Sequence, residues 1–495
     1  MSSQVIPDKP FSLKHLWIWA IFHLVAWTLV PALCNTSLPL DSVEAVLWGS
    51  EWQWGYDKHP PLSAWAAELF ALMFGDIGVY LLSQLCVVSA GIGIYKLARL
   101  LKLSEAQAVC SVVMLECLHF YTFSSVEFNV NIIQLPFWAW GWYWAMHAVE
   151  NRRVLPWVGL GLCVGLGALA KYIAVFMLIP LFSAWYLRGQ LWKVLRNPGL
   201  WLAGVISVVI FLPHLFWMYE HDWVTLTYGL DRTGSEVSAW WQHLWFPLDY
   251  VLSNVAVLIP MLVIAVWSRI RIGLRSNAPR GALGLAFGGY AFMVLLSLVM
   301  GMEPVSMWAV PIPLAMGIWL TGRFGLERCP KQVLTVSAFM GLLAIVAYVI
   351  VYGMGPFIRE KPHRVNYPGE VIAREVESIW QEAHEVKLSF VIADEWLGGL
   401  VNHYGEGRAS VMIDGAQERS AYLTEDDIHH AGAMVLWLKS RDAASGAEKA
   451  LDRVFPDVRE RFPQLVEQED LLIAWPRRAD GKVGRYGLAI IPPSL

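Results

Sequence analysis

Carboxylates and aromatic side chains gather in residues 35–77, directly after the first long apolar segment of the chain. Asp41 and Glu44 are three residues apart, so on a helix they share one face, and Trp48 extends that face. Carboxylates framed by aromatic rings at a membrane surface are costly unless they are hydrated, paired or functional. This face is therefore a candidate for acid–base chemistry, in which a carboxylate takes a proton from a reacting group.

The same residues also have a structural interpretation. Asp41-Ser-Val-Glu44 matches a capping box, which would make Asp41 the N-cap of a helix. The two interpretations are compatible, because a carboxylate at a helix start can also serve as a base.

The aromatic residues that follow predict an interfacial helix. Their spacing suits a helix lying at the depth of the lipid headgroups. These residues are Trp48, Trp52, Trp54 and Tyr56. Pro60 and Pro61 would end one helix and begin another at Leu62.

The composition places these residues in a membrane protein. Of the 495 residues, 56% are hydrophobic and 16% are charged, and 27 are tryptophan, whereas soluble domains carry about 25% charged residues. The net charge of −4 argues against nucleic acid as a partner. The composition also excludes a disordered chain, a disulfide scaffold and an ordinary cytosolic enzyme.

Apolar stretches long enough to cross a bilayer fill residues 1–354, and each needs about 20 residues. We expect eleven spans, at residues 15–34, 78–98, 105–121, 132–149, 155–170, 172–187, 199–217, 248–267, 282–301, 304–321 and 333–354. Lys171 divides one long apolar run into two of these spans. The prediction is therefore a mainly α, polytopic membrane domain.

The distribution of basic residues predicts the orientation. With the N-terminus inside, the cytoplasmic segments of residues 1–354 hold 17 Lys and Arg, against 3 in the outer segments. This is the positive-inside bias, and it predicts an inner N-terminus and an outer C-terminus. The first span is long, rich in Trp and without a small-residue cleavage site, so we interpret it as a retained anchor.

Residues 355–495 predict a soluble α/β domain on the outer side. Strand-like runs occur at residues 386–393, 410–413, 433–438, 471–475 and 488–491, and helical patterns at 394–403 and 447–455. This part contains no Gly-rich phosphate loop and no nucleophile elbow. His429-His430 is best explained as part of a solvated helix that starts after Thr424.

At the first outer loop the sequence resembles a known family. The acidic pair followed by Gly55-Tyr56-Asp57-Lys58-His59-Pro60-Pro61-Leu62 is similar to polytopic glycosyltransferases of the C superfamily (GT-C), in particular the family 39-type branch. That branch includes bacterial relatives of protein O-mannosyltransferases and of the lipid A aminoarabinose transferase. Supporting matches are Lys171-Tyr172, Pro213-His214, His221-Asp222-Trp223 and Trp308-Ala-Val-Pro311. The resemblance covers most of residues 10–325.

The resemblance implies transfer of one sugar from a polyprenyl phosphate, such as undecaprenyl phosphate, with inversion. Asp41 would be the base, because Val43 stands directly before Glu44 where many relatives have Asp. In the second outer loop Asn131 occupies the place of an expected Asp, while Glu127 lies nearby and, with Glu44, is a second catalytic candidate.

The remaining site residues follow from the same resemblance. The donor phosphate would be bound by Lys58, His59, Lys171 and Arg232. Alternatives are interface anchoring for Lys58, snorkelling for Lys171 and pairing with Asp231 for Arg232. The substrate pocket would include Trp48, Tyr56, Tyr172, His221 and Asp222. No cofactor is required by the sequence, and a divalent metal is an option without compact ligand spacing.

The expected partners are the lipid bilayer, the polyprenyl-phosphate sugar and a glycolipid or polysaccharide acceptor, such as lipid A, lipopolysaccharide or another envelope glycan. The expected location is a bacterial inner membrane, with the active site on the periplasmic side. The alternatives are a transporter, which would place ionisable residues at broken helices in mid-span, and an accessory protein of glycan assembly.

Overall fold

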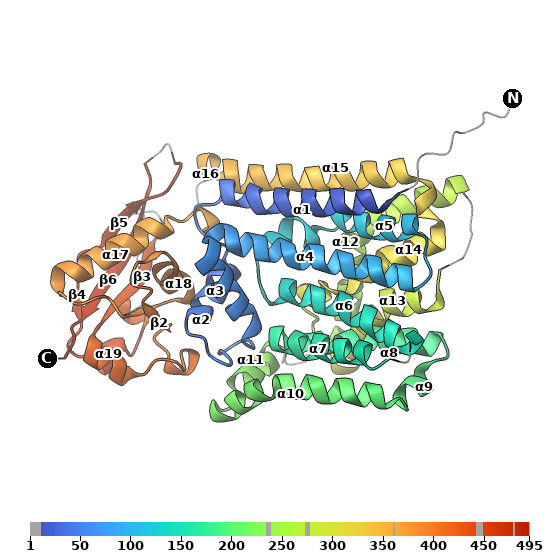
Figure 1. Ribbon diagram of the computed structural model, residues 1–495. Helices are drawn as coiled ribbons and strands as arrows, with labels where there is room; N and C mark the ends of the chain where they lie inside the picture. The colour runs from blue at the N-terminus through green and yellow to red at the C-terminus, as the bar shows by residue number, and fades with distance from the viewer. Residues whose placement is uncertain are drawn as a thin grey trace.

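The computed structural model describes residues 11–151, 153–233, 239–272, 278–359, 362–441, 449–478 and 481–494. A bundle of long helices makes up the first part of the chain, and a smaller α/β domain lies against one end of it (Figure 1). We call the end of the bundle beside this domain the outer end.

The long helices of the bundle are apolar along most of their length. Six described helices are long and apolar enough to cross a membrane, at Leu13–Cys34 (α1), Asp76–Leu100 (α4), Pro198–Glu220 (α10), Gln242–Ser268 (in α12, Gln242–Ile272), Arg280–Met300 (α13) and Pro330–Ile358 (α15, Pro330–Tyr348, with its π-helical extension and α16, Gly355–Ile358). A seventh candidate is a pair of segments, Glu105–Cys117 and His119–Val126, bent by 88°. The protein is therefore a polytopic membrane protein.

The other predicted spans coincide with shorter or interrupted helices. They correspond to α6 (Val130–Asn151), α7 (Leu155–Ala170), the segment Tyr172–Leu187 with α8 (Leu178–Leu187), and α14 (Met316–Phe324) with the 3-10 turns before it. Each of the eleven predicted ranges thus contains helix, while their number as true spans stays a prediction. Helix α7 ends at Ala170 because Lys171 takes an extended conformation, φ −164° and ψ 135°, which confirms the break predicted there.

The loop after α1 folds into two helices that lie between the bundle and the α/β domain (Figure 1). These are α2 (Leu40–Ser50) and α3 (Leu62–Phe74), as Pro60 and Pro61 predict. They pack closely, since a Cβ on Gly49 would lie 2.3 Å from the backbone oxygen of Ala64. Only glycine allows this approach.

The capping-box prediction for Asp41 is wrong. Pro39, with φ −60° and ψ 161°, is the N-cap of α2, and its side chain makes no capping hydrogen bond. Pro39 supplies the extended residue from which the helix starts, so Asp41 lies within the first turn. Its carboxylate is therefore available for other partners.

The C-terminal domain contains a mixed sheet in the order β2-β1-β3-β6-β4, with β5 also pairing to β6. The strands are β1 (Phe390–Ala393), β2 (Ser410–Ile413), β3 (Ala433–Ser440), β4 (Val466–Glu467), β5 (Leu471–Ala474) and β6 (Val483–Ile491). Strand β1 pairs in parallel with β2 and β3, and β6 runs antiparallel to β3. The α/β prediction is confirmed, although the helix expected over residues 447–455 is only α20 (Leu451–Val454) and residues 442–448 lie outside the described part.

Helices α17 (Gly369–Ala383) and α18 (Glu395–Tyr404) connect this sheet to the bundle. Asp394 follows β1 and caps α18 by accepting the backbone N–H of Trp396 at 2.9 Å and of Leu397 at 3.0 Å. Helix α18 packs on α2, where a Cβ on Gly399 would lie 2.4 Å from Cγ1 of Val43. The first residue of α18, Glu395, is thereby brought to the outer end of the bundle.

Candidate active site

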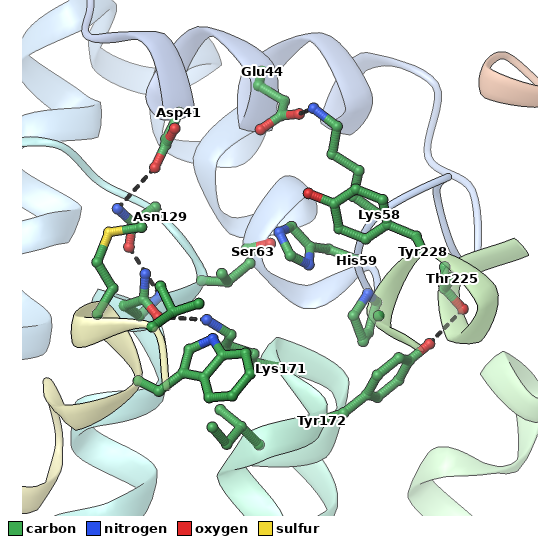
Figure 2. A pocket seen from close by; sticks show the side chains of 18 of the residues that line it. Asp41, Glu44, Lys58, His59, Ser63, Asn129, Lys171, Tyr172, Thr225 and Tyr228 are labelled. Atoms are coloured by element: carbon green, nitrogen blue, oxygen red, sulfur yellow. Dashed lines mark hydrogen bonds and ion pairs between the residues drawn. The ribbon is translucent and has the colours of Figure 1, made fainter. Parts of the chain in front are cut away.

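A cavity of about 690 Å³ lies at the outer end of the bundle, beside α2 and α3 (Figure 2). Its polar lining includes Asp41, Glu44, Lys58, Lys171 and Glu395. Its apolar lining includes Ile173, Phe176, Leu296, Met300 and Trp308. We call this the donor cavity, because its two kinds of wall suit a ligand with a charged head and an apolar chain.

Asp41 is held by the segment that precedes α6. Its Oδ2 accepts a hydrogen bond from Nδ2 of Asn129 at 3.1 Å (Figure 2). Asn129 is fixed in turn, because its Oδ1 accepts the backbone N–H of Asn131 at 2.9 Å. Burial raises the pKa of the Asp41 carboxyl, and the bond from Asn129 opposes that rise. A carboxylate with a raised pKa is a stronger proton acceptor once it is ionised.

Glu127 lies behind Asp41 and is not among the residues that line the donor cavity. Its Oε1 accepts the backbone N–H of Asp41 at 3.1 Å. Burial, together with the charge of Asp41, raises the pKa of Glu127 to about 7. The structure thus brings two of the predicted catalytic residues together, with Asp41 at the cavity and Glu127 supporting its backbone.

Lys171 reaches the donor cavity because α7 stops one residue before it. Its Nζ donates to Oδ1 of Asn131 at 2.5 Å (Figure 2). An amide at position 131 orients the ammonium group and leaves its charge in place, whereas an Asp there would neutralise it.

Lys58 is shared by two carboxylates. Its Nζ lies 2.6 Å from Oε1 of Glu44 and 2.5 Å from Oε2 of Glu395. The same oxygen of Glu395 accepts from Arg419 at 2.8 Å, and Arg419 also binds Asp57 at 2.9 Å. Five charged side chains therefore form one chain, Glu44–Lys58–Glu395–Arg419–Asp57, which we call the ionic chain.

The ionic chain sets the charge of its members. Burial lowers the pKa of Lys58, but Glu44 and Glu395 more than compensate and raise it, so Lys58 stays protonated. Burial also favours the neutral form of Glu395, yet Lys58 and Arg419 hold its pKa below the usual value. Burial and the charge of Glu395 raise the pKa of Glu44 well above its usual range. Glu395 is therefore the carboxylate that keeps its negative charge beside Lys58.

Aromatic rings form the part of the wall near Lys58. Trp48 stacks on Tyr56 with ring centres 5.4 Å apart, and His59 meets Trp48 edge-on at 6.0 Å and Tyr228 at 6.2 Å. Trp48 and His59 line the donor cavity, while Tyr56 supports Trp48 from behind. The Trp48 indole nitrogen and the hydroxyl of Ser63, another lining residue, are buried and have no hydrogen-bond partner among the residues that the structure describes. Such groups ordinarily have partners, so they favour a polar ligand at this wall.

Tyr172 links the donor cavity to α10. Its hydroxyl bonds Oγ1 of Thr225 at 2.6 Å (Figure 2). The same hydroxyl bonds Nε2 of His214 at 2.7 Å, while Nδ1 of His214 bonds the backbone oxygen of Trp54 at 2.6 Å. A carbonyl can only accept, so we infer that Nδ1 carries the hydrogen and that Nε2 accepts from the tyrosine hydroxyl. These bonds tie the first outer loop to α10 and to α11 (Val224–Thr233).

His221 and Asp222 do not line the donor cavity. They line a second cavity of about 730 Å³, which also includes Asp57, Tyr228 and Arg419. Tyr228 lines both cavities, so the two adjoin. We call the second one the outer cavity. Arg232 lies in α11, and its side chain is outside the described part of the structure.

Sequence analysis did not find Glu395, Arg419, Asn129 or Tyr228. Glu395 and Arg419 are more than 330 residues from Asp57 and Lys58 in the chain, and no local pattern predicts that contact. The available signal was Asp394-Glu395 at the carboxyl end of a predicted strand. As for metals, no three His, Cys, Asp or Glu side chains lie close enough to hold an ion within the described ranges.

The fold and this site define a class: a polytopic membrane protein with an amphipathic cavity at its outer end. Residues 58–217 match the family described as dolichyl-phosphate-mannose-protein mannosyltransferase. Among curated proteins, the lipid A galacturonosyltransferase RgtD of Rhizobium johnstonii is 26% identical over 199 residues, or 40% of this chain and 41% of RgtD. The match therefore spans less than half the length of that relative.

Solved structures match this chain over nearly its whole length. The crystal structure of ArnT from Cupriavidus metallidurans bound to undecaprenyl phosphate has a TM-score of 0.64 at 14% identity, over 98% of this chain and 99% of ArnT. The apo structure of the same protein has a TM-score of 0.58 at 13% identity over the same shares. The GT-C fold is thus confirmed, and the family match and the relatives confirm the predicted resemblance to GT-C membrane glycosyltransferases.

Proposed function

We propose that this protein transfers a single sugar from a polyprenyl phosphate to an acceptor at the outer face of a bacterial inner membrane. The observation that carries the proposal is the donor cavity, where Asp41, Lys58 and Lys171 face a wall of apolar side chains. A charged head and a long hydrocarbon tail both find a suitable surface there.

The donor binds with its polyprenyl chain along the apolar wall and its phosphate beside the lysines. The hydrogen bond to the neutral amide of Asn131 orients the ammonium group of Lys171 for this contact. Lys58 also lines the donor cavity and supplies a second ammonium group. His59, which also lines the cavity, is the third described candidate for the phosphate. The undecaprenyl phosphate named in the ArnT structure supports this class of donor.

Asp41 acts as the general base. It takes the proton of an acceptor hydroxyl while the hydroxyl oxygen bonds to the anomeric carbon of the sugar. The bond from that carbon to the phosphate oxygen breaks, and polyprenyl phosphate leaves with both electrons. A single displacement of this kind inverts the configuration, and the phosphate needs no general acid.

The acceptor approaches through the outer cavity. This cavity adjoins the donor cavity at Tyr228 and carries His221 and Asp222, which the family resemblance leads us to expect in the substrate pocket. An envelope glycan such as lipid A or lipopolysaccharide is the proposed acceptor, and the name of the relative RgtD supports it. The periplasmic side is then the side on which the reaction takes place.

The proposal is tested by sugar transfer with purified protein. The assay supplies radiolabelled undecaprenyl-phosphate sugars and glycolipids extracted from cells that lack the gene. We expect transfer by the wild type, and a loss of 10²- to 10⁴-fold with Asp41→Asn, the usual contribution of a general base. Asp426→Asn, at an exposed position of α19 (Glu425–Ala431), is the matched control and retains activity. Full transfer by a folded Asp41→Asn protein would refute the assigned mechanism.

A further inference from the structure

The C-terminal domain contributes one side chain to the lining of the donor cavity among the described residues, and that side chain is Glu395. It is the first residue of α18, which Asp394 caps and which packs on α2. The position of Glu395 is thus fixed by the docking of a whole domain.

Glu395 forms an ion pair with Lys58, one of the cations proposed to bind the donor phosphate. Its Oε2 lies 2.5 Å from Nζ of Lys58, a distance typical of a strong charge-assisted hydrogen bond. Glu44 holds the same ammonium group at 2.6 Å. Two of the three N–H donors of Lys58 are therefore engaged by carboxylates, and a phosphate must compete for this group.

We infer that Glu395 competes with phosphate for Lys58 and thereby promotes the release of polyprenyl phosphate after sugar transfer. The inference rests on the proposed function, because it assumes that polyprenyl phosphate binds in the donor cavity. It assigns a role in product release to the C-terminal domain.

Lys58 can exchange Glu395 for phosphate because Glu395 has a second cationic partner. When Lys58 turns to the phosphate, the carboxylate keeps its bond to Arg419 at 2.8 Å. Arg419 is itself held by Asp57 at 2.9 Å and by Asp414, so it stays in place. Glu395 is thus not left as a buried charge without a partner, which is the main cost of breaking a buried ion pair.

The charge of the product explains why such competition is useful. The donor is a phosphodiester with one negative charge, whereas the released polyprenyl phosphate is a monoester with about 1.5 to 2 negative charges at pH 7. The product therefore interacts with Lys58 more strongly than the donor does. A carboxylate that returns to Lys58 opposes this product binding.

The test measures binding of undecaprenyl phosphate to the full-length protein in nanodiscs. We expect Glu395→Gln to bind it about tenfold more tightly than the wild type, within the usual range of coupling between two sites. Multiple-turnover rates should fall through product inhibition, while the single-turnover rate is retained. A gain in affinity cannot result from misfolding, so this readout separates competition from a structural role.

Two further variants make the test specific. Asp414→Asn removes a carboxylate from Arg419 without touching Lys58, and we expect its affinity to stay within twofold of the wild type. Lys58→Ala combined with Glu395→Gln should abolish the gain. If the wild type binds undecaprenyl phosphate and Glu395→Gln binds it equally or more weakly, the inference is wrong. If the wild type does not bind it at all, the proposed function fails first.

Discussion

Asp41 owes its proposed chemistry to its neighbours. Asn129 fixes the carboxylate at 3.1 Å and Glu127 holds the backbone N–H of the same residue at 3.1 Å. Both partners come from the segment before α6, so the base is assembled from two outer loops. The sequence predicts Asp41 and Glu127 as members of one site, but not that one supports the other.

The Glu127–Asp41 pair predicts a pH dependence. The pKa of Glu127 is raised to about 7 by burial and by the charge of Asp41, so Glu127 is neutral below pH 7 and ionised above it. Asp41 loses its proton first, because its charge is part of what raises the pKa of Glu127. Ionisation of Glu127 near pH 7 then adds a second negative charge beside Asp41 and makes Asp41 a stronger proton acceptor. Activity should therefore show an inflection near pH 7 that Glu127→Gln removes, while the acidic limb set by Asp41 stays in place. The measurement is kcat of sugar transfer from pH 5 to 9, and an inflection near pH 7 retained in Glu127→Gln would contradict the assignment.

The partners of a charged residue inside a predicted span cannot be inferred from the local sequence. Glu116 lies in the predicted span 105–121, and nothing in the sequence indicates its partners. In the structure it accepts from Trp19 at 3.0 Å and from Trp27 at 3.3 Å, and pairs with His23 at 2.9 Å. Its partners are 89 to 97 residues away, on α1. A buried carboxylate is tolerated here because its oxygens are hydrogen-bonded.

At the scale of elements, the end of α7 is the most informative break. It was predictable, because a lysine interrupts an apolar run that is too long for one span and too short for two full ones. The contact of Lys171 with Asn131 was not predictable, since it depends on how α6 packs beside α7. The position of a charge can be inferred from the sequence, but the residue that orients it depends on tertiary packing.

This contact predicts the effect of restoring the acid that the family resemblance leads one to expect. Asn131→Asp would place a carboxylate where an amide now lies 2.5 Å from Nζ of Lys171. We expect the affinity for undecaprenyl phosphate to fall about tenfold, because the new carboxylate competes with phosphate. Asn131→Gln, which keeps the amide, is the control in the same binding assay. Equal or tighter binding by Asn131→Asp would show that Lys171 does not hold the phosphate.

In the first outer loop one local prediction is correct and another is wrong. Pro60 and Pro61 correctly predict the start of α3 at Leu62. The capping box assigned to Asp41 is wrong, because Pro39 two residues earlier sets the helix start. Local motifs of similar quality thus had different outcomes, and the rigid φ of proline decided both.

At the scale of the molecule, the C-terminal domain is part of the site. The sequence predicts its α/β class and its main strands, whose runs of apolar residues are local signals. It does not predict that α18 packs on α2, because such docking depends on shape complementarity between distant segments. Glu395 and Arg419 therefore could not be assigned to the site without the fold.

The docking itself can be tested at Gly399. A Cβ at this position would lie 2.4 Å from Cγ1 of Val43, so Gly399→Ala must push α18 away from α2. We expect a loss of about 1–3 kcal/mol in unfolding free energy, the usual cost of overpacking, and faster proteolysis of the C-terminal domain. Gly204→Ala is the matched control, since nothing lies within 4 Å of its Cβ position. Val43→Ala should restore the stability of Gly399→Ala, and a failure to do so would argue against this contact.

The ionic chain joins two compartments that otherwise share only a wall. Lys58 faces the cavity with the apolar lining, and Arg419 and Asp57 face the adjoining outer cavity. A ligand that engages Arg419 on one side changes how tightly Glu395 holds Lys58 on the other. Thermodynamic linkage makes this influence reciprocal. If a ligand in the outer cavity changes the affinity of the donor cavity by some factor, a ligand in the donor cavity changes the affinity of the outer cavity by that same factor.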